Sequence, residues 1–485
     1  MIFMIHYAQK EHQMIGRTLE SKRLQEAFAS EQSEFVALYG RRRVGKTFLV
    51  NETFGGRYAF QHSGVENVGL REQLDYFRQS LSVYGNYRCP RLTNWREAFF
   101  ELRQMLSHST AGKKIVFIDE VPWLDTAKSG FIPAFEHFWN GWASLRKDIL
   151  LIICGSATSW IVDKVLNGRG GLHNRVTRPI PIAPFTLKEC EEYAAWKKLA
   201  FDRRQIAECY MALGGVAYYW SLMLPEFSAA QNLDNLFFSP NAELKTEFGK
   251  LFASLFKHDA KYVEIVTALA SKAHGMTRDE LLAEMPSPCG GEISRYLREL
   301  EECGFIRRCN IIGTVKRGAI YKLIDNFVLF HFKFLKDRKG TDERFWELSC
   351  EKPAINTWRG LSFERICFWH IPQIRRALGI SGVLADVYSW RGKSDAPGSG
   401  DAQIDMLIDR GDHMINVCEM KFTNDEYAMS EDEGKKLRRR IEMFRSATGT
   451  RKGIMPTLIS SYGMRRNANS AIIRCEVTLD DLFAS

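Results

Sequence analysis

The sequence predicts an α/β protein whose first domain is a parallel sheet with flanking helices. Three apolar runs carry this prediction, and they cover residues 35–39, 114–118 and 149–154. None of them alternates apolar and polar side chains, which is typical of parallel strands covered by helices on both faces. Glycine, acidic or small polar residues follow each run, so we expect these residues at the carboxyl edge of the sheet.

The stretch after the first run has the spacing of a Walker A motif, a glycine followed by four residues and then by Gly-Lys-Thr. It consists of Gly40, Arg41, Arg42, Arg43, Val44, Gly45, Lys46 and Thr47. Because the two glycines lack side chains, successive N–H groups can wrap a phosphate, and the following helix offers its positive N-terminus. Lys46 would reach the β- and γ-phosphates, and the Thr47 hydroxyl would ligate Mg2+. We therefore expect a site for ATP with Mg2+.

Two acids end the second run. Asp119 is suited to hold Mg2+ through water, and Glu120 to orient the attacking water, because phosphoryl transfer mostly needs positioning and charge neutralisation. Ser156, after the third run, is a candidate sensor of the γ-phosphate or the water, with a plain strand-end turn as the alternative. Arg175 is a candidate arginine finger toward the nucleotide of a second copy in a homo-oligomer, with a solvated loop as the alternative.

These motifs resemble a known family, the archaeal-type predicted ATPases of the AAA+/STAND group. The stretches that carry the resemblance are Ile15–Glu20, the arginine-rich Walker A, Phe117–Leu124 and Cys154–Ser156. The resemblance implies that Ile15 and Arg17 lie near the adenine. It continues through residues 213–216, Leu-Gly-Gly-Val, which mark a helical lid in the family, although Ala217 stands where the family usually has proline.

The composition is that of a cytoplasmic enzyme. The chain has 485 residues, of which 45% are hydrophobic and 26% charged, enough for several domains and a sizeable core. Its 11 cysteines include no Cys-x-x-Cys pair, which argues against a disulfide framework or a zinc site. No apolar run approaches the roughly 18 residues that span a membrane, so no membrane contact is expected. The formal charge of +9 permits nucleic-acid binding without requiring it.

A winged helix is expected after the lid. Helical and strand periodicity predicts three helices and a hairpin, over residues 262–271, 277–285, 293–300, 304–308 and 319–323. The third helix of such a domain usually enters the major groove of DNA, where Arg295 and Arg298 would face phosphates, with Lys316 and Arg317 on the wing. Four glutamates on the same helix would repel phosphates, so a spacer between domains stays as open as a DNA reader.

Two strands joined by a short turn are expected near the C-terminus, over residues 403–409 and 413–421. A turn centred on Gly411 would put Asp405 opposite Val417. Because side chains alternate with a period of two, Glu419 and Lys421 would share the face of Asp405. Asp405 and Glu419 could then hold a hard cation, and Lys421 could steady the nucleophile or the transition state of phosphodiester cleavage.

An acid, a hairpin and Glu-x-Lys resemble the PD-(D/E)xK nuclease superfamily, which implies a restriction-endonuclease-like α/β fold. Residues 360–364 resemble its upstream helix, which implies that Glu364 is a further metal ligand. The archaeal ATPase family carries the same C-terminal pattern. Ile404 precedes Asp405 where the motif has proline. Glu-x-Lys also arises on solvated strands, so a catalytically inactive scaffold is the alternative. A basic helix follows, which could contact nucleic acid or be solvated; its cations are Lys435, Lys436, Arg438, Arg439 and Arg440.

Four domains are expected: a P-loop ATPase (1–185), a helical lid (186–255), a winged helix (256–335) and a nuclease-like domain (336–485). The hypothesis is an ATP-driven switch or motor that acts on DNA. The alternative is a STAND-type regulator, in which the nucleotide state controls contacts with protein partners and the last domain is inactive. Metal-dependent DNA cleavage that is lost in Lys421→Ala would separate the two.

Overall fold

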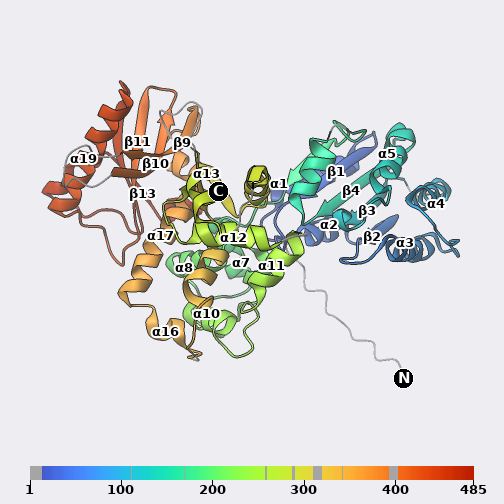
Figure 1. Cartoon of the computed structure of the whole chain (residues 1–485), viewed down its shortest axis with the longest axis horizontal. Helices are drawn as coiled ribbons and strands as arrows, with labels where there is room; N and C mark the ends of the chain where they lie inside the picture. The colour runs from blue at the N-terminus through green and yellow to red at the C-terminus, as the bar shows by residue number, and fades with distance from the viewer. Residues whose placement is uncertain are drawn as a thin grey trace. The chain divides into compact units, whose positions relative to one another are not determined.

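The computed structural model describes residues 14–110, 112–168, 170–256, 259–286, 290–309, 319–340, 342–392 and 402–484. The chain forms two compact units, Met1–Pro184 and Phe185–Ser485 (Figure 1). Among the described residues, no helix is long and apolar enough to cross a membrane. Each unit has its own sheet system and hydrophobic core.

A five-stranded, fully parallel sheet forms the centre of the first unit, in the order β2-β3-β4-β1-β5 (Figure 1). Its strands are β1 (Glu34–Tyr39), β2 (Phe60–Ser63), β3 (Lys114–Asp119), β4 (Ile149–Gly155) and β5 (Arg178–Pro181). The three predicted apolar runs are β1, β3 and β4, so the prediction of a parallel sheet is confirmed. Because β4 lies between β1 and β3, the carboxyl ends of all three meet at one edge.

Helices cover both faces of this sheet, which explains the uninterrupted apolar runs. The helices on one face are α1 (Thr18–Ala29) and α2 (Lys46–Phe54), and those on the other are α3 (Leu70–Gly85), α4 (Trp95–His108) and α5 (Phe131–Gly141). Val36 and Leu38 of β1 pack with α1 and α2, whereas Phe35 and Ala37 pack with α3, α4 and α5. The shorter helical segments are η1 (Val121–Trp123), η2 (Ala143–Leu145), α6 (Thr158–Trp160) and η3 (Ile161–Leu166).

The second unit begins with helices, as the lid prediction requires. They are α7 (Leu187–Trp196), α8 (Arg203–Leu213), α9 (Ala217–Ser221), α10 (Ala229–Phe237) and α11 (Glu247–Leu255). Capping boxes fix the first residues of α7, α8 and α10, with Thr186, Asp202 and Ser228 as the N-caps. Ala217 is the first residue of α9. Proline is favoured at this position as well, so alanine here leaves the helix start intact.

Three helices and a small antiparallel sheet follow, in the strand order β6-β8-β7. The elements are α12 (Asp259–Ala270), β6 (Met276–Thr277), α13 (Arg278–Glu284), η4 (Gly290–Glu292), α14 (Ile293–Glu302), β7 (Ile306–Cys309) and β8 (Ile320–Leu323). The two-residue strand β6 was not predicted, because its partner β8 lies far along the chain. Lys316 and Arg317 of the expected wing lie outside the described residues.

A mixed five-stranded sheet, in the order β13-β12-β11-β10-β9, dominates the C-terminal part. β10 runs antiparallel to both β9 and β11, whereas β11, β12 and β13 run parallel to one another. The strands are β9 (Ala385–Gly392), β10 (Ala402–Arg410), β11 (Met414–Lys421), β12 (Gly453–Ser460) and β13 (Cys475–Thr478). The helical elements are α15 (Asn326–Phe330), η5 (His331–Leu335), α16 (Phe345–Ser349), α17 (Pro353–Trp369), α18 (Ile371–Ala377), α19 (Glu431–Thr448), η6 (Ala468–Ile472) and η7 (Asp480–Phe483).

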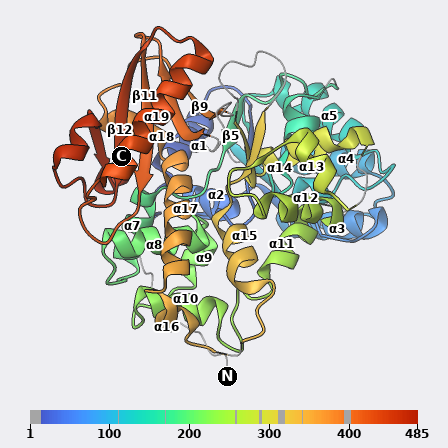
Figure 2. The ribbon, with the colours of Figure 1, turned by 60° about the vertical axis from the view of Figure 1, so that its left-hand side comes forward.

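The two faces of this sheet belong to different cores. α17 packs on one face, where it contacts β11, and side chains of α19 pack on the other (Figure 2). The α17 core is continuous with the cores of α7–α11 and of α12–α14, from Phe185 to Phe483. The three segments predicted after residue 185 therefore share one hydrophobic core, and their division into separate domains stays a prediction.

Candidate functional site

The loop between β1 and α2 has the backbone that a phosphate cradle needs. Gly40 has φ +144°, and a Cβ there would lie 2.2 Å from the carbonyl oxygen of Ile182. Gly45 is the N-cap of α2 and has φ +92°. Positive φ angles of this kind favour glycine, and at Gly40 the neighbouring strand also leaves no room for a side chain. The two glycines of the motif are therefore required by the local structure.

Lys46 is only 6% exposed, although it carries a charge. Its Nζ donates hydrogen bonds to the carbonyl oxygens of Gly40 (2.9 Å) and Arg41 (3.0 Å). The ammonium group thus lies within the loop that the motif defines. A buried lysine needs compensating oxygens, and phosphate oxygens are stronger partners than carbonyls.

Thr47 and Asp119 come together at the edge of the sheet. The Thr47 hydroxyl donates a hydrogen bond of 2.7 Å to Oδ2 of Asp119. The other carboxylate oxygen, Oδ1, accepts the N–H of Glu120 at 2.8 Å and the thiol of Cys154. Burial raises the pKa of that thiol well above its ordinary value, so it stays protonated and can donate. Two oxygen groups of the kind that Mg2+ prefers are adjacent, and they fit this ion.

Glu120 and Ser156 also come together, from the ends of β3 and β4. Glu120 has a left-handed backbone, with φ +46°. Its carboxylate accepts the Ser156 hydroxyl at Oε1 (2.6 Å) and the Ser156 N–H at Oε2 (3.1 Å). A non-glycine residue with positive φ is uncommon and often belongs to a functional site. Ser156 is therefore in direct contact with the acid proposed to orient water.

Arg17, which lies outside the Walker A motif, contacts the phosphate loop. It is 6% exposed, and its Nη2 donates to the carbonyl oxygens of Val44 (3.2 Å) and Ala183 (2.6 Å). Ile15, two residues earlier, is partly buried. The contact with Val44 ties the segment before α1 to the Walker A loop. The adenine contact of Ile15 and Arg17 stays a prediction.

The other arginines singled out in the first unit differ in exposure. Arg41 is buried, whereas Arg42 and Arg43 are partly exposed. Arg175 is exposed, in a turn where its N–H donates to the carbonyl oxygen of Leu172 at 3.0 Å. Exposure leaves the Arg175 side chain available to another molecule, and its role as a finger stays a prediction.

The sheet order and the loop geometry together decide the class of fold. A parallel strand (β1) leads into a glycine loop and a helix (α2). The acid-ending strand β3 lies on the far side of β4, so one strand separates it from β1. The first unit has a P-loop NTPase-like fold. In this P-loop unit, the magnesium, water-orienting and phosphate-binding candidates lie at one edge of the sheet.

No protein-family model matches the chain. It is 27% identical over 362 residues to an uncharacterized protein of Methanocaldococcus jannaschii, which covers 73% of this chain and 76% of the relative. Among solved structures it is similar to the Walker-type ATPase PABY2304 of Pyrococcus abyssi, with 18% identity, a TM-score of 0.49, and coverage of 66% of this chain and 96% of that one. It is also similar to the ORC1 protein of Aeropyrum pernix in complex with DNA, with 14% identity, a TM-score of 0.32, and coverage of 66% and 92%.

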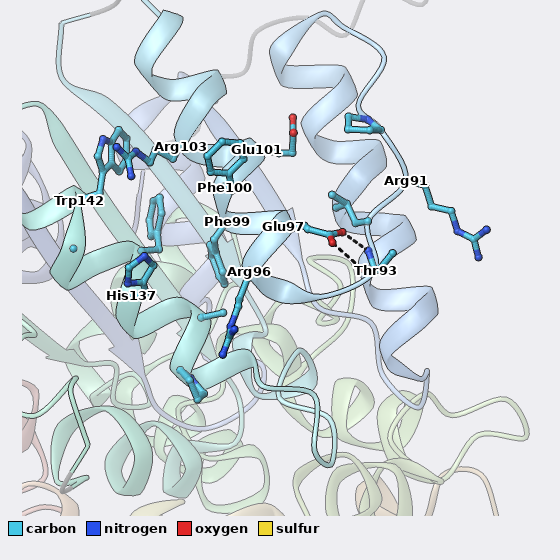
Figure 3. Close-up of a pocket in the computed structure, with 16 residues that line it drawn as sticks. Arg91, Thr93, Arg96, Glu97, Phe99, Phe100, Glu101, Arg103, His137 and Trp142 are labelled. Atoms are coloured by element: carbon cyan, nitrogen blue, oxygen red, sulfur yellow. Dashed lines mark hydrogen bonds between the residues drawn. The ribbon is translucent and has the colours of Figure 1, made fainter.

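The P-loop unit also contains a pocket of about 860 Å3 beside α4 and α5 (Figure 3). Arg96, Phe100 and Arg103 of α4 line it together with Trp142, and the Arg103 guanidinium lies 5.9 Å from the Trp142 ring centroid. None of its lining residues belongs to the Walker A or Walker B motif. The sequence patterns gave no sign of this pocket.

In the second unit, the strand register around Asp405 differs from the prediction. Leu407, and not Asp405, pairs with Val417. The pairing of β10 with β9 also shifts between Ile404 and Leu407, which indicates a bulge at Asp405 and the next residue. The predicted register was wrong because turn length and bulges are set by backbone geometry that the alternation of side chains does not reveal.

The bulge changes the face on which Asp405 lies. Ile404 belongs to the core on the α19 side and Met406 to the core on the α17 side. Asp405, next to Ile404 in the strand, therefore faces α17. On β11, Val417 packs on the α19 side, so Glu419 faces α19. The expectation that the two carboxylates share one face is corrected.

Different basic residues contact the two carboxylates. Asp405 Oδ1 lies 3.4 Å from Lys322 Nζ of β8 and accepts Gln403 Nε2 at 2.7 Å. Glu419 Oε2 lies 2.9 Å from Arg440 Nη1 of α19, and its Oε1 lies 3.1 Å from Lys421 Nζ. Neither Lys322 nor Gln403 stands in a recognisable motif, so the sequence gave no signal for them. Arg440 belongs to the basic run for which the sequence left nucleic-acid contact and a solvated helix face both open.

Glu364 of α17 lies near Asp405. Burial raises the pKa of Glu364 to about 8, and the negative charges of Asp405 and Glu419 add to this, whereas Lys322 opposes it. Yet no group of three or more His, Cys, Asp or Glu side chains in the described part of the chain is arranged to hold a metal ion. As they lie here, Asp405, Glu419 and Glu364 do not fit a metal, because protein cations already contact two of them.

Proposed function

We propose that this chain binds ATP with Mg2+ in its P-loop unit and hydrolyses it. The observation that carries the proposal is the hydrogen bond between Thr47 and Asp119, which brings two separate motifs to one point beside Lys46. Mg2+ would neutralise phosphate charge at this point when bound. Lys46 binds and orients the β- and γ-phosphates, and Glu120 orients the water.

Ser156 has a supporting role in this proposal. Its hydroxyl and its N–H both donate to the Glu120 carboxylate, so the acid is held at a defined place. A carboxylate has about four lone-pair sites, so Glu120 can accept both Ser156 donors and a hydrogen bond from the attacking water at the same time.

A matched set of variants tests the proposal. Purified wild-type chain is expected to release phosphate from ATP in the presence of Mg2+. Glu120→Gln should retain nucleotide binding and lose turnover, whereas the exposed Glu72→Gln on α3 should behave as wild type. A wild-type hydrolysis rate in Glu120→Gln would show that another residue orients the water.

We further propose that the second unit couples ATP turnover to DNA, through a winged helix over residues 259–323 and a nuclease-like α/β domain after it. The order of helix, strand, two helices and hairpin supports the first part, and the mixed sheet between α17 and α19 supports the second. Binding of a labelled duplex, measured by fluorescence anisotropy at several salt concentrations, tests it. Double substitution of the exposed Arg438 and Arg439 of α19 by alanine should weaken binding and reduce its salt dependence.

A regulator that binds protein partners is the second candidate, and two observations favour it. On α14, Arg295 lies 2.9 Å from Glu292 and Arg298 lies 3.9 Å from Glu302, so its cations already contact acids. In the C-terminal domain, Asp405 is paired with a lysine. If no duplex binds with or without ATP, and no metal-dependent cleavage occurs that Lys421→Ala abolishes, this candidate is preferred.

A further inference from the structure

We propose that Lys322 takes the place of a divalent cation at Asp405, so that the C-terminal acidic site is closed until the Lys322 side chain withdraws. This inference rests on the proposed nuclease-like nature of the domain and adds a mode of regulation to it. Asp405, Glu419 and Glu364 have the residue types of a metal site, but they are not arranged as one. The cation that contacts Asp405 comes from a different segment of the second unit.

The ion pair is well shielded from water. Lys322 Nζ lies 3.4 Å from Asp405 Oδ1, and the two side chains are 11% and 22% exposed. Charges in such a place are screened much less by salt than surface charges are. Separating the pair leaves a partly buried carboxylate without its counter-charge, which is unfavourable unless another cation arrives.

Three further contacts hold β8 and the turn before β6 against α17, β9 and β10. The Lys322 ammonium lies 5.5 Å from the ring centroid of Phe368 on α17. Gln403, which also contacts Asp405, has its Nε2 2.9 Å from Nδ1 of His274. Arg391 of β9 donates to the carbonyl oxygen of Gly275 at 3.2 Å. The lysine is therefore one member of a cluster of contacts between two segments.

Withdrawal of the Lys322 side chain would favour the binding of a metal ion at Asp405. Lys322 and Glu364 both line a cavity of about 400 Å3, which gives the lysine side chain space to move. Without the ammonium, the partly buried Asp405 carboxylate lacks a counter-charge, and a divalent cation, with its preference for oxygen ligands, would supply one with oxygens of Asp405 and Glu364 as ligands. Because the ammonium and the metal ion both use Asp405, they compete. Whatever displaces the Lys322 side chain therefore promotes metal binding, and a bound metal promotes that displacement by the same factor.

The test measures Mn2+ binding to the full chain without nucleotide, by electron paramagnetic resonance of the free ion. Lys322→Met keeps the length of the side chain and removes its charge. Lys322→Met should bind Mn2+ at an Asp405-dependent site for which the affinity of wild type is at least tenfold lower. The double variant Lys322→Met/Asp405→Asn should lose this gain in affinity. Lys333→Met is the matched control, since this exposed lysine lines the same cavity without an ion pair to Asp405, and it should bind as wild type.

Two other outcomes would distinguish failure of the closing role of Lys322 from absence of the metal site. If wild type and Lys322→Met bind Mn2+ equally well at a site that Asp405→Asn abolishes, a metal site exists and the closing role of Lys322 is wrong. If no variant has an Asp405-dependent site, the metal site itself is absent, and both proposals fail at this domain. Lys322→Gln, which keeps a hydrogen-bond donor for Asp405, replaces Lys322→Met should that variant fail to fold, with the same expected gain.

Discussion

The Thr47 hydroxyl donates a hydrogen bond of 2.7 Å to the Asp119 carboxylate, and so joins the end of the phosphate loop to the end of β3. Thr47 is in the first turn of α2, which follows β1, and Asp119 ends β3; β4 separates β1 from β3 in the sheet. Their contact brings the two magnesium candidates within one hydrogen bond of each other. The predictions for the P-loop unit depend on this relationship.

Lys46→Ala should abolish measurable ATP binding. The substitution removes the ammonium group within the loop, and hydrogen bonds to charged groups contribute about 1.5–3 kcal/mol each. Titration calorimetry with a non-hydrolysable ATP analogue checks this, with the exposed Lys22→Ala of α1 as the control. Unchanged affinity in Lys46→Ala would reject the Walker A assignment.

Ser156→Ala should lower the rate of ATP hydrolysis without weakening ATP binding. It removes the hydroxyl donor at Oε1 of Glu120 and leaves the backbone N–H at Oε2. The carboxylate is then less well positioned, and removing one positioned donor from a phosphoryl-transfer site is expected to cost about tenfold or more in rate. Steady-state phosphate release at saturating ATP measures the effect. A wild-type rate would mean that the pair has no part in turnover.

Arg175→Ala tests the arginine finger in trans. If Arg175 reaches the nucleotide of a second copy, the variant should lose about a thousandfold in turnover, as finger arginines do. Mixing it with Lys46→Ala protein should restore some hydrolysis, because one mixed site then has both groups. The exposed Arg71→Ala of α3 is the control. Full activity of Arg175→Ala alone would reject the role.

Gly40→Ala should destabilise the P-loop unit as well as the site. The added Cβ would lie 2.2 Å from the carbonyl oxygen of Ile182, at a backbone φ of +144°. Relieving that overlap requires movement of β5 or of the loop, at a cost on the order of 2 kcal/mol. Gly69→Ala, where nothing lies within 4 Å of the new Cβ, should leave the melting temperature unchanged. Equal melting temperatures for both variants would contradict the prediction.

His370 should make the second unit sensitive to acid. Its Nε2 accepts the N–H of Leu187 at 3.0 Å and its ring is buried, which lowers the pKa of His370 to about 4. The unfolded chain has a higher histidine pKa, near 6.5, so it takes up the proton first as the pH falls. The contribution to stability is therefore complete above about pH 6.5 and declines toward pH 4, by about 1.4 kcal/mol per pH unit.

His370→Gln should remove that part of the pH dependence. The free energy of unfolding, measured in urea at several pH values between 4 and 7, should change less steeply in this variant than in wild type. The exposed His413→Asn serves as the control and should keep the wild-type slope. Identical slopes in wild type and His370→Gln would contradict the assignment of the acid sensitivity to this residue.

The P-loop unit could be predicted in detail because its signals are local. Gly40, Gly45 and Lys46 stand within one loop, and the chemistry of each follows from its place in that loop. The motifs did not predict the contact between Glu120 and Ser156, although both residues had been singled out. The two side chains meet only because of the order of the strands in the sheet. The Arg17 contact with Val44 was missed for the same reason.

For the C-terminal acids, less of the site could be predicted from the sequence. Asp405 was correctly predicted on one strand and Glu419 and Lys421 on the next, but the register of these strands and the faces of the side chains were not. A bulge of one residue moves a side chain to the other face of a sheet, and alternation in the sequence cannot reveal it. Lys322 lies far along the chain from Asp405, so only folding brings them together.

By itself, the sequence determined the phosphate loop, the parallel strands and the identity of the ATP-site candidates, because these depend on the chemistry of consecutive residues and on hydrophobic patterns. The tertiary structure alone decided which cation contacts each C-terminal carboxylate. The physical reason is that an ion pair depends on distance and burial, and these are set by how strands and helices pack, not by the residues that flank each charge.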